Sequence, residues 1–314
     1  MNAYFSGLSV APGWLWAAFL TGIVIMLVVD LSLFGKGGQE VKIRTALLES
    51  ALWVMVAVVF NIWFAFEYGR DLGVEFLTGY LIEKSLSVDN LFVILLVFNA
   101  FKIKNEHQHR VLFYGVLGAV VLRAFFIILG AQLIHAFEWV LYIFGLILVV
   151  TGIKFLRDTE ENSDVLDHWA LRLLKRVLPT TNKIDGETFF VRESGVLKAT
   201  PLFLALIVIE ATDLVFAVDS IPAVFAVTQD AFVAFASNIL AILGLRALYF
   251  VLAVWVAKLK YLKPGLAVIL GFIGTKMLIK DFYKIPSLVS LMVIFLVLLT
   301  AGLGSWYASR ELKT

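Results

Sequence analysis

Long apolar runs alternate with short polar connections along almost the whole chain. An α-helix rises about 1.5 Å per residue, so it needs about 20 apolar residues to cross the hydrocarbon core of a bilayer. Nine runs meet this requirement, with approximate limits 14–34, 46–66, 76–100, 111–134, 137–156, 201–227, 231–257, 262–280 and 287–307. The pattern predicts an all-α polytopic membrane protein with about nine transmembrane helices.

Composition supports this class of protein. Hydrophobic residues make up 61% of the 314 residues, charged residues make up 16%, and the mean hydropathy is +0.94. These values lie far from those of a soluble domain. A net charge of +2 gives no indication of a nucleic-acid partner, and the absence of Cys excludes disulfides and thiolate metal sites. The partner that composition indicates is the lipid bilayer.

Basic residues gather in alternate connections, and this distribution predicts the orientation of the chain. They follow the first, third and seventh runs, as Lys36, Lys42, Arg44, Lys102, Lys104, Arg110, Lys258, Lys260 and Lys263. By the positive-inside rule the N-terminus lies outside and the C-terminus in the cytoplasm. No Lys or Arg precedes the first run, so we expect no removable signal peptide.

The connection 157–200 is the one long loop, and its basic character also places it in the cytoplasm. Apolar residues share one face of a predicted surface helix in it, namely Leu166, Trp169, Leu173 and Val177. The following segment ETFFVRESGVLKAT predicts a short β-hairpin that turns at Ser194 and Gly195.

Two acidic motifs resemble each other. EKSLSVDNLFV begins at Glu83 and EATDLVFAVDSIPAV begins at Glu210, and each has an acid six residues before a V-D-[NS]-[LI] tetrad. Two further pairs of segments follow in the same order: VLRAFFI with GLRALYF, and GLILVVTGIK with GFIGTKMLIK. Each copy covers three runs, so the second copy must enter the membrane from the opposite side.

The sequence therefore predicts a three-plus-three inverted repeat, an arrangement typical of secondary transporters. The predicted organisation is an N-terminal two-helix segment (1–75), a first repeat (76–156), a cytoplasmic loop (157–200), a second repeat (201–280) and a C-terminal transmembrane helix (281–314).

Five acids fall inside the third and sixth runs, namely Glu83, Asp89, Glu210, Asp213 and Asp219. A charge at the centre of a membrane helix costs about 2.5–3.5 kcal/mol, so together they need compensation of about 15 kcal/mol. Lys84, Arg123 and Arg246 are the internal bases, and one interpretation is that they pair with the acids only to hold the bundle together. Five acids against three bases leave surplus negative charge, which favours an ion pathway.

The spacing of these acids limits how they bind an ion. Glu83 and Asp89 are six residues apart, which separates them by about 240° around a straight helix and ~9 Å along it. Either the helix opens, for example at Pro222 in the second copy, or acids of the two copies meet, Asp89 with Asp219, at the pseudo-two-fold axis.

The candidate ligands offer only oxygen donors. Asn90 and Ser220 add amide and hydroxyl oxygens to the five carboxylates, and all four His lie at the ends of runs or in loops. The predicted metal ligands are therefore Glu83, Asp89, Asn90, Glu210, Asp213, Asp219 and Ser220. Such a set suits hard divalent cations such as magnesium, calcium and manganese. Asp30 and Glu49 are weaker candidates, with snorkelling or helix packing as the simpler interpretation.

Motifs for enzymatic chemistry are missing from the sequence. It contains no GxxxxGK[ST] loop and no Ser/His or Cys/His arrangement within the predicted spans. We therefore expect neither ATP hydrolysis nor another enzymatic activity, and no resident cofactor.

Five segments resemble the TerC family of integral membrane proteins, most closely its Alx-type members: EKSLSVDNLFV, FFVRESGVLKATPL, FAVDSIPAVFAVT, AILGLRALYF and KMLIKDFYKIP. The resemblance runs from the first span to the last. It implies a multi-pass protein of the bacterial inner membrane, a relation to the LysE superfamily of exporters, and export of manganese(II). It also implies that the family's metal-binding acids are the five carboxylates named above, all of which are present.

The sequence thus predicts a secondary transporter that exports manganese(II) through an acidic site in the third and sixth spans. Arg123 and Arg246 are expected to neutralise the acids when the site is empty. Two other classes remain as alternatives: a proton-coupled exporter of a small organic solute, and a non-transporting membrane scaffold that binds unknown proteins through residues 157–200. Coupling to protons is compatible with manganese export as well.

Overall fold

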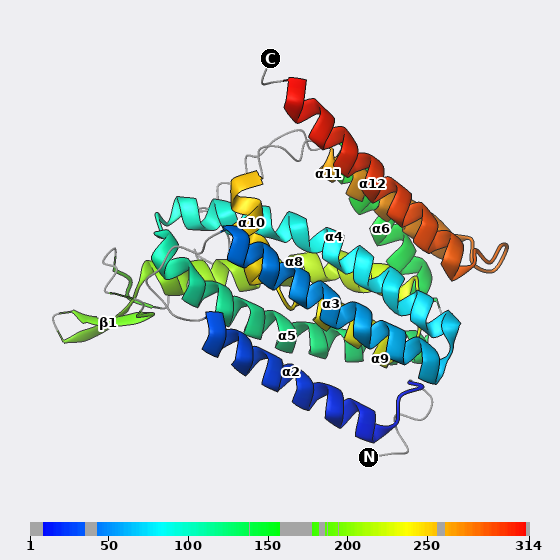
Figure 1. Cartoon of the computed structure of the whole chain (residues 1–314), viewed down its shortest axis with the longest axis horizontal. Coiled ribbons are helices and arrows are strands. Elements are labelled where there is room, and N and C mark those ends of the chain that lie inside the picture. The colour runs from blue at the N-terminus through cyan, green and yellow to red at the C-terminus, as the bar shows by residue number, and fades with distance from the viewer. Residues whose placement is uncertain are drawn as a thin grey trace.

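The computed structural model describes residues 9–34, 43–137, 139–157, 178–181, 186, 188–193, 195–255 and 261–311. Its helices are α2 (Gly13–Phe34), α3 (Ile43–Tyr68), α4 (Arg70–Ala100), α5 (Asn105–Ala136), α6 (Val140–Arg157), α8 (Pro201–Phe225), α9 (Ala231–Ile242), α10 (Leu245–Trp255), α11 (Leu262–Leu278) and α12 (Ser287–Glu311). A hairpin of β1 (Phe190–Glu193) and β2 (Val196–Ala199) projects from one end of the bundle (Figure 1). The predicted all-α class is confirmed, with this hairpin as the expected exception.

Eight of the nine predicted runs fall on one helix each, and the run 231–257 falls on two, α9 and α10. Within the described ranges, α2, α3, α5, α8 and α12 are long and apolar enough to cross a membrane, and α9 with α10 adds a sixth span if the bent pair is counted as one. The remaining helices α4, α6 and α11 are either shorter or less apolar than these. The protein is thus a polytopic membrane protein, while the count of nine spans stays a prediction.

Burial separates a protein core from apolar outer faces. Every residue of α9 is buried, and its Phe232 and Phe235 contact the rings of Trp16 and Phe19 on α2. In contrast, α2, α3 and α12 leave many large apolar side chains exposed, among them Phe66 with 89% of its surface accessible. Apolar side chains that face outward are expected where helices border lipid.

The helix contacts follow a pattern that an inverted repeat would require. α4 packs against α9, α8 packs against α5, and the pairs α4–α8 and α6–α11 are also in contact. In the two predicted repeats α4 corresponds to α8, α5 to α9 and α6 to α11. Exchange of the repeats therefore turns the α4–α9 contact into the α8–α5 contact and leaves the pairs α4–α8 and α6–α11 unchanged. The inverted relation itself stays a prediction.

Glycines permit the closest of these contacts. A Cβ on Gly274 of α11 would lie 2.6 Å from the carbonyl oxygen of Gly145 on α6, and a Cβ on Gly152 would lie 2.9 Å from the carbonyl oxygen of Ala267. Small residues at a helix interface let the two backbones approach each other in membrane bundles. α6 and α11 are therefore packed backbone against backbone.

The structure breaks a different helix from the one expected. α8 runs without interruption through Pro222, which lies three residues before the end of that helix, so its missing N–H affects only the last turn. The break lies instead within the run 231–257, where α9 and α10 meet at an angle of 43°. Gly244 adopts φ +82° at this point, a conformation that side chains disfavour.

The hairpin in the long loop is confirmed. β1 and β2 are antiparallel with Glu193 opposite Val196, and Gly195 lies in the turn between them. Gly195 has φ +83°, as such turns require. The predicted surface helix around 166–177 lies outside the described residues.

We predict that Gly244→Ala lowers the free energy of unfolding by about 1–3 kcal/mol, because the new residue must hold a positive φ. Its Cβ would also lie 2.7 Å from the Trp53 ring. The matched control is Gly271→Ala, at a helical position with no other atom within 4 Å of the added Cβ. Thermal unfolding in detergent should show a lower midpoint for the first variant only, and equal midpoints would contradict the assignment of strain.

Candidate functional site

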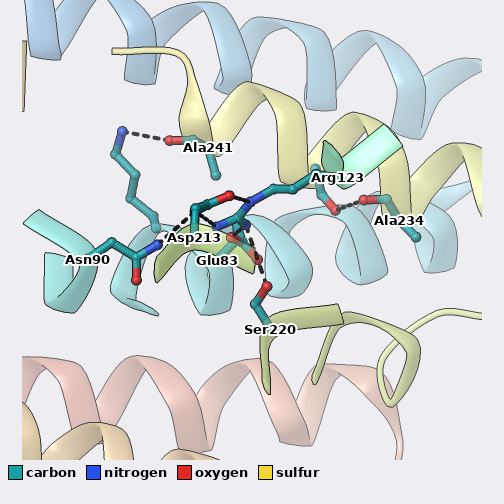
Figure 2. A network of polar contacts seen from close by, with 9 residues as sticks. Glu83, Asn90, Arg123, Asp213, Ser220, Ala234 and Ala241 are labelled. Atoms are coloured by element: carbon teal, nitrogen blue, oxygen red, sulfur yellow. Dashed lines mark hydrogen bonds and ion pairs between the residues drawn. The ribbon is translucent and has the colours of Figure 1, made fainter. Parts of the chain in front are cut away.

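Three of the seven predicted ligands contact the guanidinium group of Arg123 on α5, and a fourth joins them through Asp213 (Figure 2). Arg123 Nη2 donates to Asp213 Oδ1 at 2.8 Å, and its Nε donates to Asp213 Oδ2 at 3.3 Å. Glu83 forms an ion pair with Nη1, and the Ser220 Oγ lies 3.5 Å from the same nitrogen. Asn90 Nδ2 donates to Asp213 Oδ1 at 3.2 Å. These five residues are called the Arg123 cluster below.

Helix periodicity explains how the cluster forms. Glu83 and Asn90 are seven residues apart on α4, and Asp213 and Ser220 are seven apart on α8. Seven residues are almost two full turns, so both members of each pair lie on one face of their helix. Arg123 extends from α5 between these faces and joins the three helices.

Burial makes the pairing energetically necessary. Arg123 is 1% exposed, Glu83 is 0% exposed and Asp213 is 14% exposed. Charges enclosed in this way are stable only when they are paired, since each loses its hydration. One guanidinium serves two carboxylates here, so the cluster carries one surplus negative charge if both acids are ionised.

Lys84 has a different partner from the acids. Its Nζ donates to the carbonyl oxygen of Ala241 at 3.1 Å, at the last turn of α9 (Figure 2). A cation at this position is favourable because the C-terminal end of a helix carries partial negative charge. Lys84 therefore stabilises the end of α9 next to the α9–α10 break.

The other three predicted ligands lie elsewhere or are not described. Asp219 accepts a hydrogen bond from Thr151 Oγ1 of α6 at 2.7 Å, on a different face of α8 from Asp213. The carboxylate of Glu210 lies against the backbone of Gly118 on α5, one turn before Asp213. The side chain of Asp89 lies outside the described residues, so its expected meeting with Asp219 stays a prediction.

A second cluster surrounds Arg246 of α10. Arg246 Nη2 donates to Asp30 Oδ1 on α2 at 3.0 Å and to Glu49 Oε1 on α3 at 3.1 Å. Its Nη1 lies 3.0 Å from Nδ1 of His109 on α5, which accepts the hydrogen bond because a guanidinium can only donate. These four residues are called the Arg246 cluster below. These ion pairs of Arg246 are thus with the two acids that the sequence ranked as weaker candidates.

A small cavity of about 40 Å³ lies between the two clusters. Asn90, Asp213 and Arg246 all line it, together with residues of α5 and residues on both sides of the α9–α10 break. This volume suffices for a water-sized guest. The Asn90 Oδ1 is buried and has no hydrogen-bond partner, so one oxygen donor at the cavity wall is unused.

In this conformation the carboxylates bind arginine. Among the described residues, no three His, Asp or Glu side chains are grouped so that they could hold a metal ion. Glu83 and Asp213 both face Arg123, whose guanidinium takes the place that a cation would need. Metal binding by these acids therefore requires Arg123 to withdraw from at least one of them.

The sequence is similar to those of known membrane proteins. The model of the family described as "Integral membrane protein TerC family" matches residues 68–313. A Myxococcus xanthus protein named "Uncharacterized membrane protein STKORF319" is 46% identical over 304 residues, which are 97% of this chain and 95% of that protein. An Escherichia coli K12 protein named "Putative membrane-bound redox modulator Alx" is 48% identical over 309 residues, which cover 95% of this chain and 96% of that protein. No solved structure matches the chain.

We predict that Arg123→Gln destabilises the protein by about 3–5 kcal/mol, because Glu83 and Asp213 are left buried without a cation. The triple variant that adds Glu83→Gln and Asp213→Asn should recover most of this loss. Arg70→Gln, at an exposed arginine, is the control and should change stability by less than about 0.5 kcal/mol. The measurement is the midpoint of thermal unfolding in detergent. Equal midpoints for Arg123→Gln and Arg70→Gln would show that the ion pairs contribute nothing.

Proposed function

Because the chain belongs to the TerC family of integral membrane proteins, we propose that it is a secondary transporter that exports manganese(II) from the cytoplasm. The observation that carries the proposal is the meeting of Glu83, Asn90 and Asp213 from two acidic helices beside a small cavity. Ionisable side chains inside a membrane bundle are costly and mark ion pathways more often than they serve stability.

The chemistry of the donors supports a hard divalent cation as substrate. Carboxylate and amide oxygens surround the site, and the unpaired Asn90 Oδ1 is a further donor at the cavity wall. Such oxygens are the usual ligands of manganese, magnesium and calcium. The choice of manganese among these rests on the resemblance to the family, and the donor set alone does not make it.

Charge balance supports a site that both binds and releases its ion. With both acids ionised, the two carboxylates and one guanidinium of the Arg123 cluster sum to −1, and one divalent ion changes the sum to +1. The net charge of −1 attracts a divalent cation, while the positive guanidinium limits how tightly the two carboxylates hold it. Alternating access needs this property, because the ion must leave on the other side.

Orientation and location belong to the same proposal. The N-terminus would lie outside and the C-terminus in the cytoplasm of a bacterial cell, with the protein in the inner membrane. In this orientation the Arg246 cluster and the hairpin lie toward the cytoplasm, because Asp30, Glu49 and His109 all belong to helix ends that border basic connections.

The name of the Alx relatives concerns redox modulation, which is a different class of function. The 314 residues include no Cys, so thiol–disulfide exchange is not open to this chain. Export of a metal that itself undergoes redox reactions would alter redox balance indirectly. Manganese export therefore accommodates the relatives' name without redox chemistry in the chain itself.

We predict that Asp213→Asn lowers manganese(II) flux into proteoliposomes by at least about tenfold, because the site loses a charged ligand. Glu106→Gln is the matched control, since Glu106 lies in the first turn of α5 and is 45% exposed. Flux is measured with a proton gradient imposed and then collapsed, and with magnesium and calcium as competitors.

Three outcomes would count against manganese export. Equal flux in wild type and Asp213→Asn would remove the site from the pathway. Efflux of a small organic solute without manganese would favour the proton-coupled exporter. Loss of cellular function on deletion of residues 157–200, with none on neutralisation of the buried acids, would favour the scaffold.

A further inference from the structure

The Arg246 cluster and the Arg123 cluster lie at opposite ends of one cavity. His109 of the first and Arg123 of the second are both on α5, fourteen residues apart, which is about 21 Å of helix. The α5 residues that line the cavity, Leu112, Gly115, Val116 and Ala119, all lie between them in sequence. The cavity is thus bounded by one arginine cluster toward the cytoplasmic end of α5 and by the other toward its middle.

The Arg246 cluster closes its end of the cavity by joining four helices. Its members come from α2, α3, α5 and α10, and the arginine is 3% exposed while Glu49 is 4% exposed and Asp30 is 13% exposed. Both carboxylates accept from the same nitrogen of one side chain. Movement of that single side chain would therefore break the ion pairs of α10 with α2 and with α3 together.

A preformed break lies next to the arginine. α9 ends at Ile242, α10 begins at Leu245, and Gly244 between them has φ +82°. α9 is buried along its whole length, whereas α10 leaves it at an angle of 43°. Rotation at residues 243 and 244 would carry Arg246 away from Asp30 and Glu49 and leave α9 in place, as hinge motions do.

We propose that Arg246, held by Asp30 and Glu49, is the gate that closes the cytoplasmic end of the cavity, and that α10 opens it by rotation about Leu243 and Gly244. The role of the gate in transport rests on the proposed function, because alternating access requires the cytoplasmic end to open and close. The closure itself rests on the ion pairs, the cavity and the break, whatever substrate passes.

The charges of the cluster fit this role. Two carboxylates and one guanidinium leave surplus negative charge at the cytoplasmic end of the route, which attracts a cation toward the gate. The same carboxylates that hold Arg246 would stabilise the approaching cation. The cation would therefore compete with the guanidinium and favour the open state.

The test uses the absence of Cys from the chain, which makes any introduced thiol unique. Ala119 lines the cavity and is 7% exposed, so Ala119→Cys places a small thiol behind the gate. Inverted membrane vesicles expose the cytoplasmic face to a water-soluble maleimide. Addition of Arg246→Gln should raise the rate of alkylation by about tenfold or more, because the rate follows the population of the open state. Arg246→Lys, which keeps a cation, should raise it less.

Two controls protect this interpretation. Lys104→Cys, at the cytoplasmic end of α5 with its side chain 77% exposed, should react at the same rate with and without Arg246→Gln. Glu49→Gln leaves Arg246 paired with Asp30 and the buried charges balanced, so it provides a variant that folds even if Arg246→Gln does not. It should raise the alkylation rate of Cys at position 119 by a smaller factor.

The outcomes separate the gate from the proposed function. Unchanged cytoplasmic labelling of folded Glu49→Gln and Arg246→Gln would overturn the gate, and so would an equal rise in labelling from both faces, which indicates a loosened bundle. Increased cytoplasmic labelling without manganese flux in the wild type would support the gate and refute manganese export. Manganese flux in the wild type with unchanged labelling of the variants would support manganese export and refute the gate.

Discussion

The structure depends on the requirement that a carboxylate enclosed among apolar helices be paired with a cation or hydrogen-bonded. Two arginines meet most of this requirement among the described side chains, and each gathers two acids from different helices. Removal of either arginine would leave acids without compensation, at a cost of several kcal/mol per ion. The ion pairs therefore fix the helices along their axes more strictly than apolar contacts do, since a slide of one turn would break them.

Under the proposed function, structural pairing and ion transport are successive uses of the same acids. A carboxylate that binds arginine in one conformation becomes available to a metal ion when the arginine withdraws. The carboxylate then exchanges one cation for another and is never left without a positive partner. This exchange explains why a bundle keeps more acids than it has bases. It also explains why Glu83 and Asp213 face a guanidinium in the present conformation.

The helices could be predicted from the sequence because the length and apolar character of a membrane span leave few alternatives. The break in one helix and the partners of the buried charged side chains could not. Apart from Ser237, Asn238 and Arg246 the run 231–257 is apolar, so its hydropathy does not mark the break that the positive φ of Gly244 shows. The sequence prediction of the site was based on acids six residues apart. Residues that share a helix face are instead seven apart, as Glu83 and Asn90 are. The partners of Arg246 lie about 200 residues away in the first two helices, and no local pattern connects them.

The contact between α6 and α11 has a consequence for motion. Where two backbones touch through glycine, with a Cβ on Gly274 excluded by the Gly145 carbonyl, neither helix can tilt without a collision. α6 belongs to the first predicted repeat and α11 to the second. Any rocking of one repeat against the other must therefore keep the α6–α11 contact, the seam between the repeats, as its fulcrum. Displacement then grows with distance from the seam, as at the far end of a lever. Loosening the seam with larger or smaller residues would alter the amplitude of the stroke and leave the chemistry of the site untouched.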